Sequence, residues 1–262
     1  MRRFVAVMAA VVGLAPGAVH AATLYGVGPF QAFQAQDLFE IDTTTGEATL
    51  IGSTGLEQVV GMAWDEADST MYAYTAQADL YSVDLSSGAT TLVAAWAATV
   101  PEGGLAIDAA GIAYTANGTL LATVDLDTAD LITVGPFGLA GDDVSGLAFA
   151  CDGTLFGYAK NGTLDDALVT IDATTGEATL VDTLTGILGD ASMGGLDVDP
   201  DSDLLYLSDS TNLYTVDPLT ASATWIGGHG VTGLGAIAFV PEPSVICLLC
   251  LGAVLPRPRR RR

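Results

Sequence analysis

The residues with the most chemistry to offer in this 262-residue sequence are four aspartates that alternate along one short segment. Asp197, Asp199, Asp201 and Asp203 fall in the run Leu-Asp-Val-Asp-Pro-Asp-Ser-Asp. Carboxylate oxygens clustered in a loop suit Ca²⁺, which takes six to eight oxygen ligands in flexible geometry. The spacing therefore predicts a calcium site at these four residues. The alternative is an ordinary turn, because Pro200 presets a tight-turn conformation and the glycine and glutamate of an EF-hand loop are missing.

Groups suited to nucleophilic or acid–base catalysis are sparse. Of the two histidines, only His229 lies outside the N-terminal segment, and its glycine neighbours predict a solvated loop residue. Cys151 has no basic neighbour in sequence to lower its thiol pKa, so it is expected to fill buried space. A serine–histidine–aspartate set needs a positioned histidine, and a multi-histidine metal site needs several. The sequence therefore predicts a protein that is not an enzyme.

A hairpin recurs five times along the sequence and forms the framework that positions the aspartates, His229 and Cys151. Each copy has a strand ending in aspartate, a turn rich in Ser, Thr and Gly, and a second strand; the matched aspartates are Asp42, Asp84, Asp125, Asp172 and Asp217. Their spacings of 42, 41, 47 and 45 residues are typical of β-propeller blades built only from strands. A carboxylate in such a place accepts backbone N–H groups of its turn, so these aspartates are predicted to be architectural.

A second strand pair, opened by a Gly-x-Ala motif, lies between the hairpins. Its third position is Ala63, Ala106, Ala148, Asp197 or Ala238, and small residues there suit an innermost strand near a crowded axis. The domain begins with three strands, at 24–27, 38–41 and 48–51, and ends with a lone inner strand at 235–240. We therefore expect an all-β, five-bladed β-propeller of four-stranded blades over residues 22–240. The C-terminal inner strand would close the ring by pairing with the N-terminal three strands. The pattern resembles small bacterial propellers of the NHL and YVTN kind.

The N-terminus has the layout of a secretion signal. Arg2 and Arg3 precede an apolar run at 4–14, and small residues at Val19 and Ala21 suit a signal peptidase. The apolar run is too short for a stable membrane span. We expect residues 1–21 to be a signal peptide that is removed by cleavage after Ala21.

The C-terminal residues 241–262 contain Pro241-Glu242-Pro243, an apolar stretch at 245–255, and a basic end with Arg257, Arg259, Arg260, Arg261 and Arg262. A cluster of arginines favours the cytoplasmic side and stops translocation. This order of features resembles the PEP-CTERM protein-sorting signal. The resemblance implies transient anchoring in the inner membrane and processing by an exosortase. It also implies delivery to the surface, outer envelope or extracellular matrix of a Gram-negative-type bacterium that makes extracellular polysaccharide.

The charge of the domain between these ends is strongly negative. Residues 22–241 hold 30 of the 31 acidic residues and one basic residue, Lys160, which gives a net charge of −29. Such a surface repels nucleic acids and anionic lipids. The charge excludes nucleic-acid binding and leaves polysaccharides, surface proteins and cations as expected partners.

Three functions fit these features. The leading hypothesis is an exported, non-catalytic envelope or matrix propeller that binds or scaffolds carbohydrate, protein or cation. The second is a calcium-dependent propeller hydrolase of the lactonase-like kind. That enzyme would need acidic residues from several inner strands, and only Asp197 is acidic among the five matched positions. The third is a purely structural surface spacer.

Overall fold

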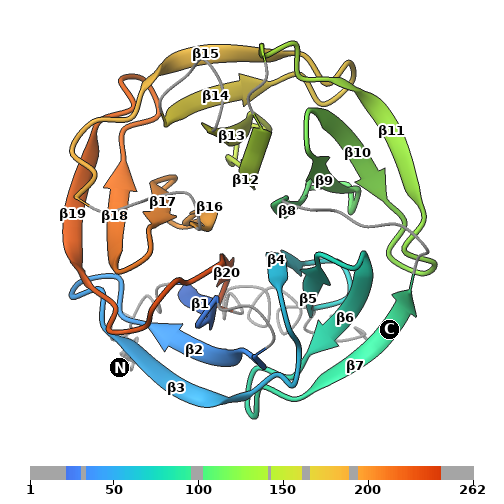
Figure 1. Cartoon of the computed structure of the whole chain (residues 1–262), viewed down its shortest axis with the longest axis vertical. Coiled ribbons are helices and arrows are strands. Elements are labelled where there is room, and N and C mark those ends of the chain that lie inside the picture. The colour runs from blue at the N-terminus through green and yellow to red at the C-terminus, as the bar shows by residue number, and fades with distance from the viewer. Residues whose placement is uncertain are drawn as a thin grey trace, which may run out of the picture.

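The computed structural model of the chain describes residues 22–30, 34–95, 103–140, 143–160, 166–188 and 194–242. These residues form twenty β-strands in five four-stranded antiparallel sheets, which are arranged as blades around a central axis (Figure 1). The predicted all-β, five-bladed β-propeller is confirmed. The described residues include no helix that is long and apolar enough to cross a membrane.

Each blade runs from an inner strand beside the axis to an outer strand at the rim (Figure 1). From the inside outward, blade 1 contains β20 (Ala236–Val240), β1 (Thr23–Gly28), β2 (Asp37–Ile41) and β3 (Ala48–Ser53). Blade 2 contains β4 (Val59–Asp65), β5 (Thr70–Thr75), β6 (Asp79–Val83) and β7 (Thr90–Ala95). Blade 3 contains β8 (Leu105–Ile107), β9 (Ala113–Asn117), β10 (Leu120–Val124) and β11 (Leu131–Pro136).

Blades 4 and 5 complete the ring. Blade 4 contains β12 (Asp143–Phe149), β13 (Leu155–Lys160), β14 (Ala167–Ile171) and β15 (Ala178–Thr183). Blade 5 contains β16 (Leu196–Val198), β17 (Leu205–Ser208), β18 (Asn212–Val216) and β19 (Ala223–Gly228). The residues at which the inner strands begin lie together at one end of the axis, and residues from the ends of these strands surround a cavity at the other, so all five inner strands end at the same face of the propeller.

The two ends of the domain close the ring in the predicted way. Strand β20 pairs antiparallel with β1, in a register that sets Thr23 opposite Val240 and Val27 opposite Ala236. The last strand of the domain therefore completes the first blade, so neither β20 nor β1 is left as an open edge at this seam.

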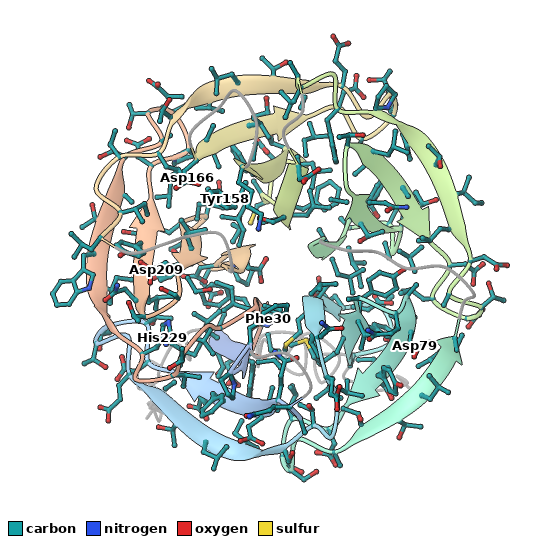
Figure 2. All side chains as sticks on the ribbon, viewed as in Figure 1. Phe30, Asp79, Tyr158, Asp166, Asp209 and His229 are labelled. Carbon is teal, nitrogen blue, oxygen red and sulfur yellow. The ribbon has the colours of Figure 1, made fainter. Side chains whose placement is uncertain are left out.

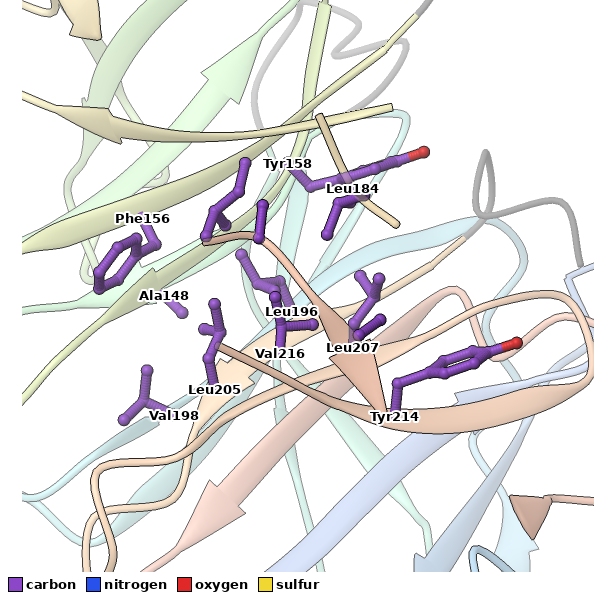
Figure 3. Packing of buried hydrophobic residues seen from close by; sticks show 13 residues of the cluster. Ala148, Phe156, Tyr158, Leu184, Leu196, Val198, Leu205, Leu207, Tyr214 and Val216 are labelled. Carbon is purple, nitrogen blue, oxygen red and sulfur yellow. The ribbon is translucent and has the colours of Figure 1, made fainter. Parts of the chain in front are cut away.

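The blades are held together by apolar side chains that face one another between adjacent sheets. Between blades 4 and 5, Phe156 lies in one buried cluster with Leu205, Leu207 and Val216 (Figure 3). Complete burial of a side chain of this size contributes about 1.5 to 3 kcal/mol. Burial of such side chains between the blades stabilises the domain, whose described residues contain no disulfide.

The five repeated aspartates have the architectural role that the sequence predicts. Each carboxylate accepts the backbone N–H two residues further on, at 2.7 Å for Asp42, 2.8 Å for Asp84, 2.9 Å for Asp125, 2.8 Å for Asp172 and 2.8 Å for Asp217. Hydrogen bonds from turn hydroxyl and N–H groups keep the pKa of Asp42, Asp84, Asp125 and Asp172 below the usual range. These carboxylates therefore fix the hairpin turns at the face where the inner strands end.

Candidate functional site: the central cavity

The channel along the propeller axis is almost closed where the inner strands begin. There, four glycines of the repeated motif and Ala236 of β20 approach one another, and we call this ring the glycine collar (Gly61, Gly104, Gly146, Gly195 and Ala236). A Cβ on Gly104 would lie 2.3 Å from the backbone nitrogen of Leu147 in the next blade. The free volume at the collar is about 10 Å³, which leaves room for one water molecule at most.

The channel widens at the other end, where the inner strands finish. A cavity of about 690 Å³ opens there, within the usual size range of ligand pockets. We call it the central cavity. All five blades contribute to its wall, through residues that include Phe239, Ala63, Ala106, Phe149 and Asp197. Figure 2 shows side chains of every blade surrounding this opening.

Acidic and aromatic side chains dominate the chemistry of the cavity wall. Its carboxylates belong to Asp65, Glu66, Asp108, Asp152 and Asp197, and no Lys or Arg is among its described lining residues. Its aromatic rings belong to Trp64, Tyr114, Phe149 and Phe239, with Tyr114 and Phe149 in edge-to-face contact at 5.5 Å between centroids. Such a wall favours cationic or neutral, hydroxyl-bearing groups and repels anions.

Asp197 has a special place in this wall, since alanine occupies the same inner-strand position in the other blades. Its Oδ2 accepts the backbone N–H of Phe239 at 2.6 Å, which links blade 5 to blade 1. Burial of the carboxyl raises its pKa to about 7, although the hydrogen bonds from Phe239 and Val198 oppose that shift. The protonation of Asp197 therefore changes near neutral pH, where the charge of the cavity changes with it.

The other three aspartates of the predicted calcium site have separate partners. Asp199 accepts the N–H of Asp201 at 3.0 Å and the hydroxyl of Ser202. Asp201 accepts the N–H of Ala22 at 2.7 Å, and Asp203 accepts the N–H of Cys151 at 3.1 Å. Across the described ranges, no three His, Cys, Asp or Glu side chains form a group that could hold a metal ion. The calcium site at Asp197, Asp199, Asp201 and Asp203 stays a prediction.

The prediction that His229 is a solvated loop residue was wrong. The side chain is buried, with its Nδ1 accepting the N–H of Val231 at 3.3 Å and its Nε2 lying 3.2 Å from the carbonyl oxygen of Asp209. This arrangement fits a neutral ring with its proton on Nε2, and burial lowers the pKa of His229. Figure 2 places His229 and Asp209 on blade 5, away from the central opening.

Asp209 is the centre of a buried polar network that the sequence did not reveal. Its carboxylate accepts the N–H of Thr211 at 2.7 Å, the N–H of Asn212 at 2.6 Å and the hydroxyl of Tyr214 at 2.6 Å. The run Asp-Ser-Thr-Asn resembles other turns in the chain, so only the burial of Asp209 sets it apart. These contacts give it a structural role at the collar end of blade 5.

The prediction that Cys151 is buried was also wrong. The residue is exposed in the turn after β12 and lines the central cavity. The neighbouring blade explains its position, because the backbone N–H of Cys151 bonds to Asp203 in the turn between β16 and β17. Partial desolvation and the negative charge of Asp203 raise the thiol pKa.

Two residues of the predicted sorting motif are described. Pro241 lines the central cavity directly after β20. Oε1 of Glu242 accepts a hydrogen bond from the hydroxyl of Thr23 at 3.4 Å. Pro243, Arg259, Arg260, Arg261 and Arg262 lie outside the described residues, as does the predicted signal at 1–21. Both ends of the domain therefore meet at the seam, on the face where the cavity opens.

Comparisons with known proteins give a structural likeness only. No family model and no curated protein matches the chain. A solved structure of a structural genomics protein of unknown function from Bacteroides thetaiotaomicron VPI-5482 matches with a TM-score of 0.46 and 14% sequence identity. The match covers 78% of this chain, which spans 64% of that protein's length.

Proposed function

We propose that this chain is an exported, non-catalytic β-propeller that binds a ligand in its central cavity at the cell envelope or in the extracellular matrix. The observation that carries this proposal is the shape of the channel. The channel is almost closed at the glycine collar and opens at the other end into a cavity of about 690 Å³. A channel with one mouth is suited to holding a ligand, whereas a conducting pore needs two.

The wall of the cavity narrows the class of ligand. Carboxylates accept hydrogen bonds from hydroxyl and amino groups, and aromatic faces contact the apolar faces of sugar rings or a cationic group. A neutral or amino-bearing carbohydrate fits this combination, and so does a basic side chain of a surface protein. Phosphorylated, sulfated or uronate-rich ligands would meet like charges from Asp65, Glu66, Asp108 and Asp152.

The same wall supports a non-catalytic role. No histidine is among the described lining residues, and the cavity thiol, Cys151, has a raised pKa that disfavours the reactive thiolate. A hydrolase of the lactonase-like kind would need several inner-strand oxygen ligands around one metal ion. Asp197 is the only carboxylate at the matched inner-strand positions.

Export and sorting fit the placement of the two ends of the domain. Thr23 lies opposite Val240, so the predicted signal and the predicted PEP-CTERM tail are attached side by side. This proximity suits a precursor that is held at both ends in the inner membrane. In this proposal an exosortase-type enzyme processes the tail and the propeller then reaches the surface, the outer envelope or the matrix.

Two tryptophans allow a matched test of ligand binding. Trp64 lines the cavity, whereas Trp225 lies on the outer strand β19 and is 52% exposed. Calorimetric titration with oligosaccharides released from the host's extracellular polysaccharide should give at least tenfold weaker binding for Trp64→Ala, which corresponds to about 1.4 kcal/mol. Trp225→Ala should bind like the parent. Equal affinity of Trp64→Ala and the parent contradicts the cavity as the site, and no binding by any form favours the structural spacer.

The sorting part of the proposal has its own test. Removal of residues 241–262 in the native host should divert the propeller from the envelope fraction into the soluble exported fraction, because the anchoring and recognition elements are lost. Cell fractionation followed by immunoblotting measures this change. An unchanged distribution would overturn the sorting role of Pro241, Glu242 and Pro243.

A further inference from the structure

The first residue after the predicted signal occupies a place suited to a charged amino terminus. The backbone nitrogen of Ala22 lies 2.7 Å from Oδ2 of Asp201, in the turn between β16 and β17 of the neighbouring blade. The side chain of Ala22 is buried in a cluster with Leu24, Tyr206 and Phe239. The apolar contacts fix the position of the Ala22 nitrogen, and the carboxylate of Asp201 accepts its hydrogen bond.

We propose that Asp201 is the receptor for an N-terminal ammonium that export processing creates at Ala22. This inference rests on cleavage after Ala21, which belongs to the proposed function. A signal peptidase adds water across the peptide bond between Ala21 and Ala22. The carbonyl of Ala21 leaves as a carboxylate, and the nitrogen of Ala22 becomes a primary amine that takes up a proton.

The chemical change at this nitrogen strengthens a bond that the uncleaved chain already makes. Before cleavage, a neutral peptide N–H donates to Asp201; afterwards, an ammonium donates to the same carboxylate. The carboxylate makes this hydrogen bond charge-assisted in both states, and the ammonium adds a direct attraction between opposite charges that the neutral N–H lacks. Processing would therefore tighten the seam, because Ala22 precedes β1 of blade 1 and Asp201 belongs to blade 5.

Every described charged group around Ala22 favours the ammonium form. Asp199 lies in the same turn and accepts the N–H of Asp201. Glu242 follows β20 and is bonded to Thr23, the residue next to Ala22. Asp42 follows Ile41, which pairs with Leu24 in β2, and Tyr206 is the titratable group of β17 beside Ala22. The carboxylates attract an ammonium, so its pKa should exceed the ordinary range of about 7.7 to 8.0.

The sign of the resulting pH dependence follows from this shift. A cation whose pKa is raised on folding stabilises the folded state fully below the unfolded pKa. That contribution disappears as the pH rises through the folded pKa. The ion pair should therefore operate at pH 7 and vanish in alkaline solution.

The composition of the chain makes the ammonium easy to observe. The mature chain 22–262 has two amines, the α-amine of Ala22 and the side chain of Lys160. Reductive methylation with ¹³C-formaldehyde followed by NMR titration measures the pKa of the α-amine. We expect a value above 8 in the parent and a return to the ordinary range in Asp201→Asn. Asp203→Asn removes the same charge two residues away and should leave the pKa raised, as the matched control.

A second variant tests the position of the charge without changing Asp201. A mature chain with one additional glycine before Ala22 keeps an ammonium but moves it out of reach. It should melt several degrees lower than the mature chain at pH 7, and the difference should disappear above pH 10. Equal pKa values in the parent and Asp201→Asn, or equal melting temperatures of the extended and mature chains, overturn the receptor role. N-terminal sequencing of the exported protein tests cleavage after Ala21 separately.

Discussion

The two ends of the inner strands differ in a way that separates folding from function. At the collar end, four blades place glycine at the same position and blade 1 places Ala236 there. Four positions later, at the cavity end, the blades carry Asp65, Asp108, Ala150, Asp199 and Val240. Glycine recurs at four of these positions because the next blade leaves no room there for a Cβ. Asp65, Asp108 and Ala150 line the open cavity, where side chains of different size and charge fit.

This difference indicates that the repeat encodes the ring and that departures from it encode the site. Asp197 illustrates the second half of that statement, since it replaces alanine on one inner strand and changes the charge of the cavity near neutral pH. Substitutions at the collar should therefore alter stability first. Substitutions at the cavity end should alter charge and binding with a smaller effect on the fold.

The largest expected effect comes from filling the collar. A Cβ on Gly104 would lie 2.3 Å from a backbone nitrogen of blade 4, so blades must separate to admit it. We expect Gly104→Ala to lower the free energy of unfolding by about 3 kcal/mol, as overpacking against a rigid neighbour does. Urea denaturation of the mature chain measures the loss.

A glycine on the open face of the same blade provides the control. Gly111 has a φ of +81° in the turn between β8 and β9, and nothing lies within 4 Å of a Cβ placed there. Gly111→Ala should cost about 1 kcal/mol, through the left-handed conformation alone. If both variants lose the same stability, steric closure of the collar is not what fixes glycine at position 104.

An intermediate effect is expected from the pH dependence of Asp197. Its pKa is raised on folding to about 7 from 3.8, so the unfolded chain releases the proton first as the pH rises. Stability should therefore fall between pH 4 and pH 7. The carboxyl is desolvated, but the residue keeps part of its surface at the cavity wall, so solvent screening limits the change to about 1 to 3 kcal/mol. Asp197→Asn should remove this fall, as measured by urea denaturation at several pH values.

A turn aspartate should respond in the opposite sense. Hydrogen bonds from Thr174 lower the pKa of Asp172, so its contribution is present above the unfolded pKa and is lost as the pH falls. Asp172→Asn should therefore lower stability at neutral pH, match the parent in acid where Asp172 is protonated, and leave the fall between pH 4 and pH 7 intact. A parent protein with no fall in that interval would show that Asp197 is not held in a desolvated site.

The fold was readable from the sequence because its signals are local and repeated. Each turn aspartate is followed within a few residues by the groups that it binds, and a glycine stands at the start of the inner strand in four of the five blades. The closure by β20 followed from counting strands. One detail differed, since the last inner strand begins at Ala236 and not at Gly235.

The site was less predictable because its residues bond to partners that lie far away in the sequence. The carboxylate of Asp203 accepts the backbone N–H of Cys151, 52 residues away in the sequence. The carbonyl oxygen of Asp209 is hydrogen-bonded to the ring of His229, 20 residues away. No local pattern reveals such pairings, so Cys151 was expected to be buried and His229 to be exposed. For the same reason, the alternation of Asp197, Asp199, Asp201 and Asp203 along the chain did not reveal that each carboxylate has different partners.

The smallest effect concerns Cys151, which reports on the cavity end directly. In a mature chain with Cys247→Ser and Cys250→Ser, a small maleimide should label Cys151 in the folded state because the residue is exposed. Labelling should be slower than in urea, since desolvation and Asp203 raise the thiol pKa and reduce the thiolate fraction. Asp203→Asn should accelerate labelling roughly threefold at pH 7, a few-fold gain in thiolate, and Asp172→Asn should not. Labelling that begins only on unfolding would place the thiol in the protein interior. A ligand seated in the central cavity should also slow the reaction, whereas a ligand bound at the rim of the propeller should not, so the rate of labelling distinguishes the cavity from the outer strands.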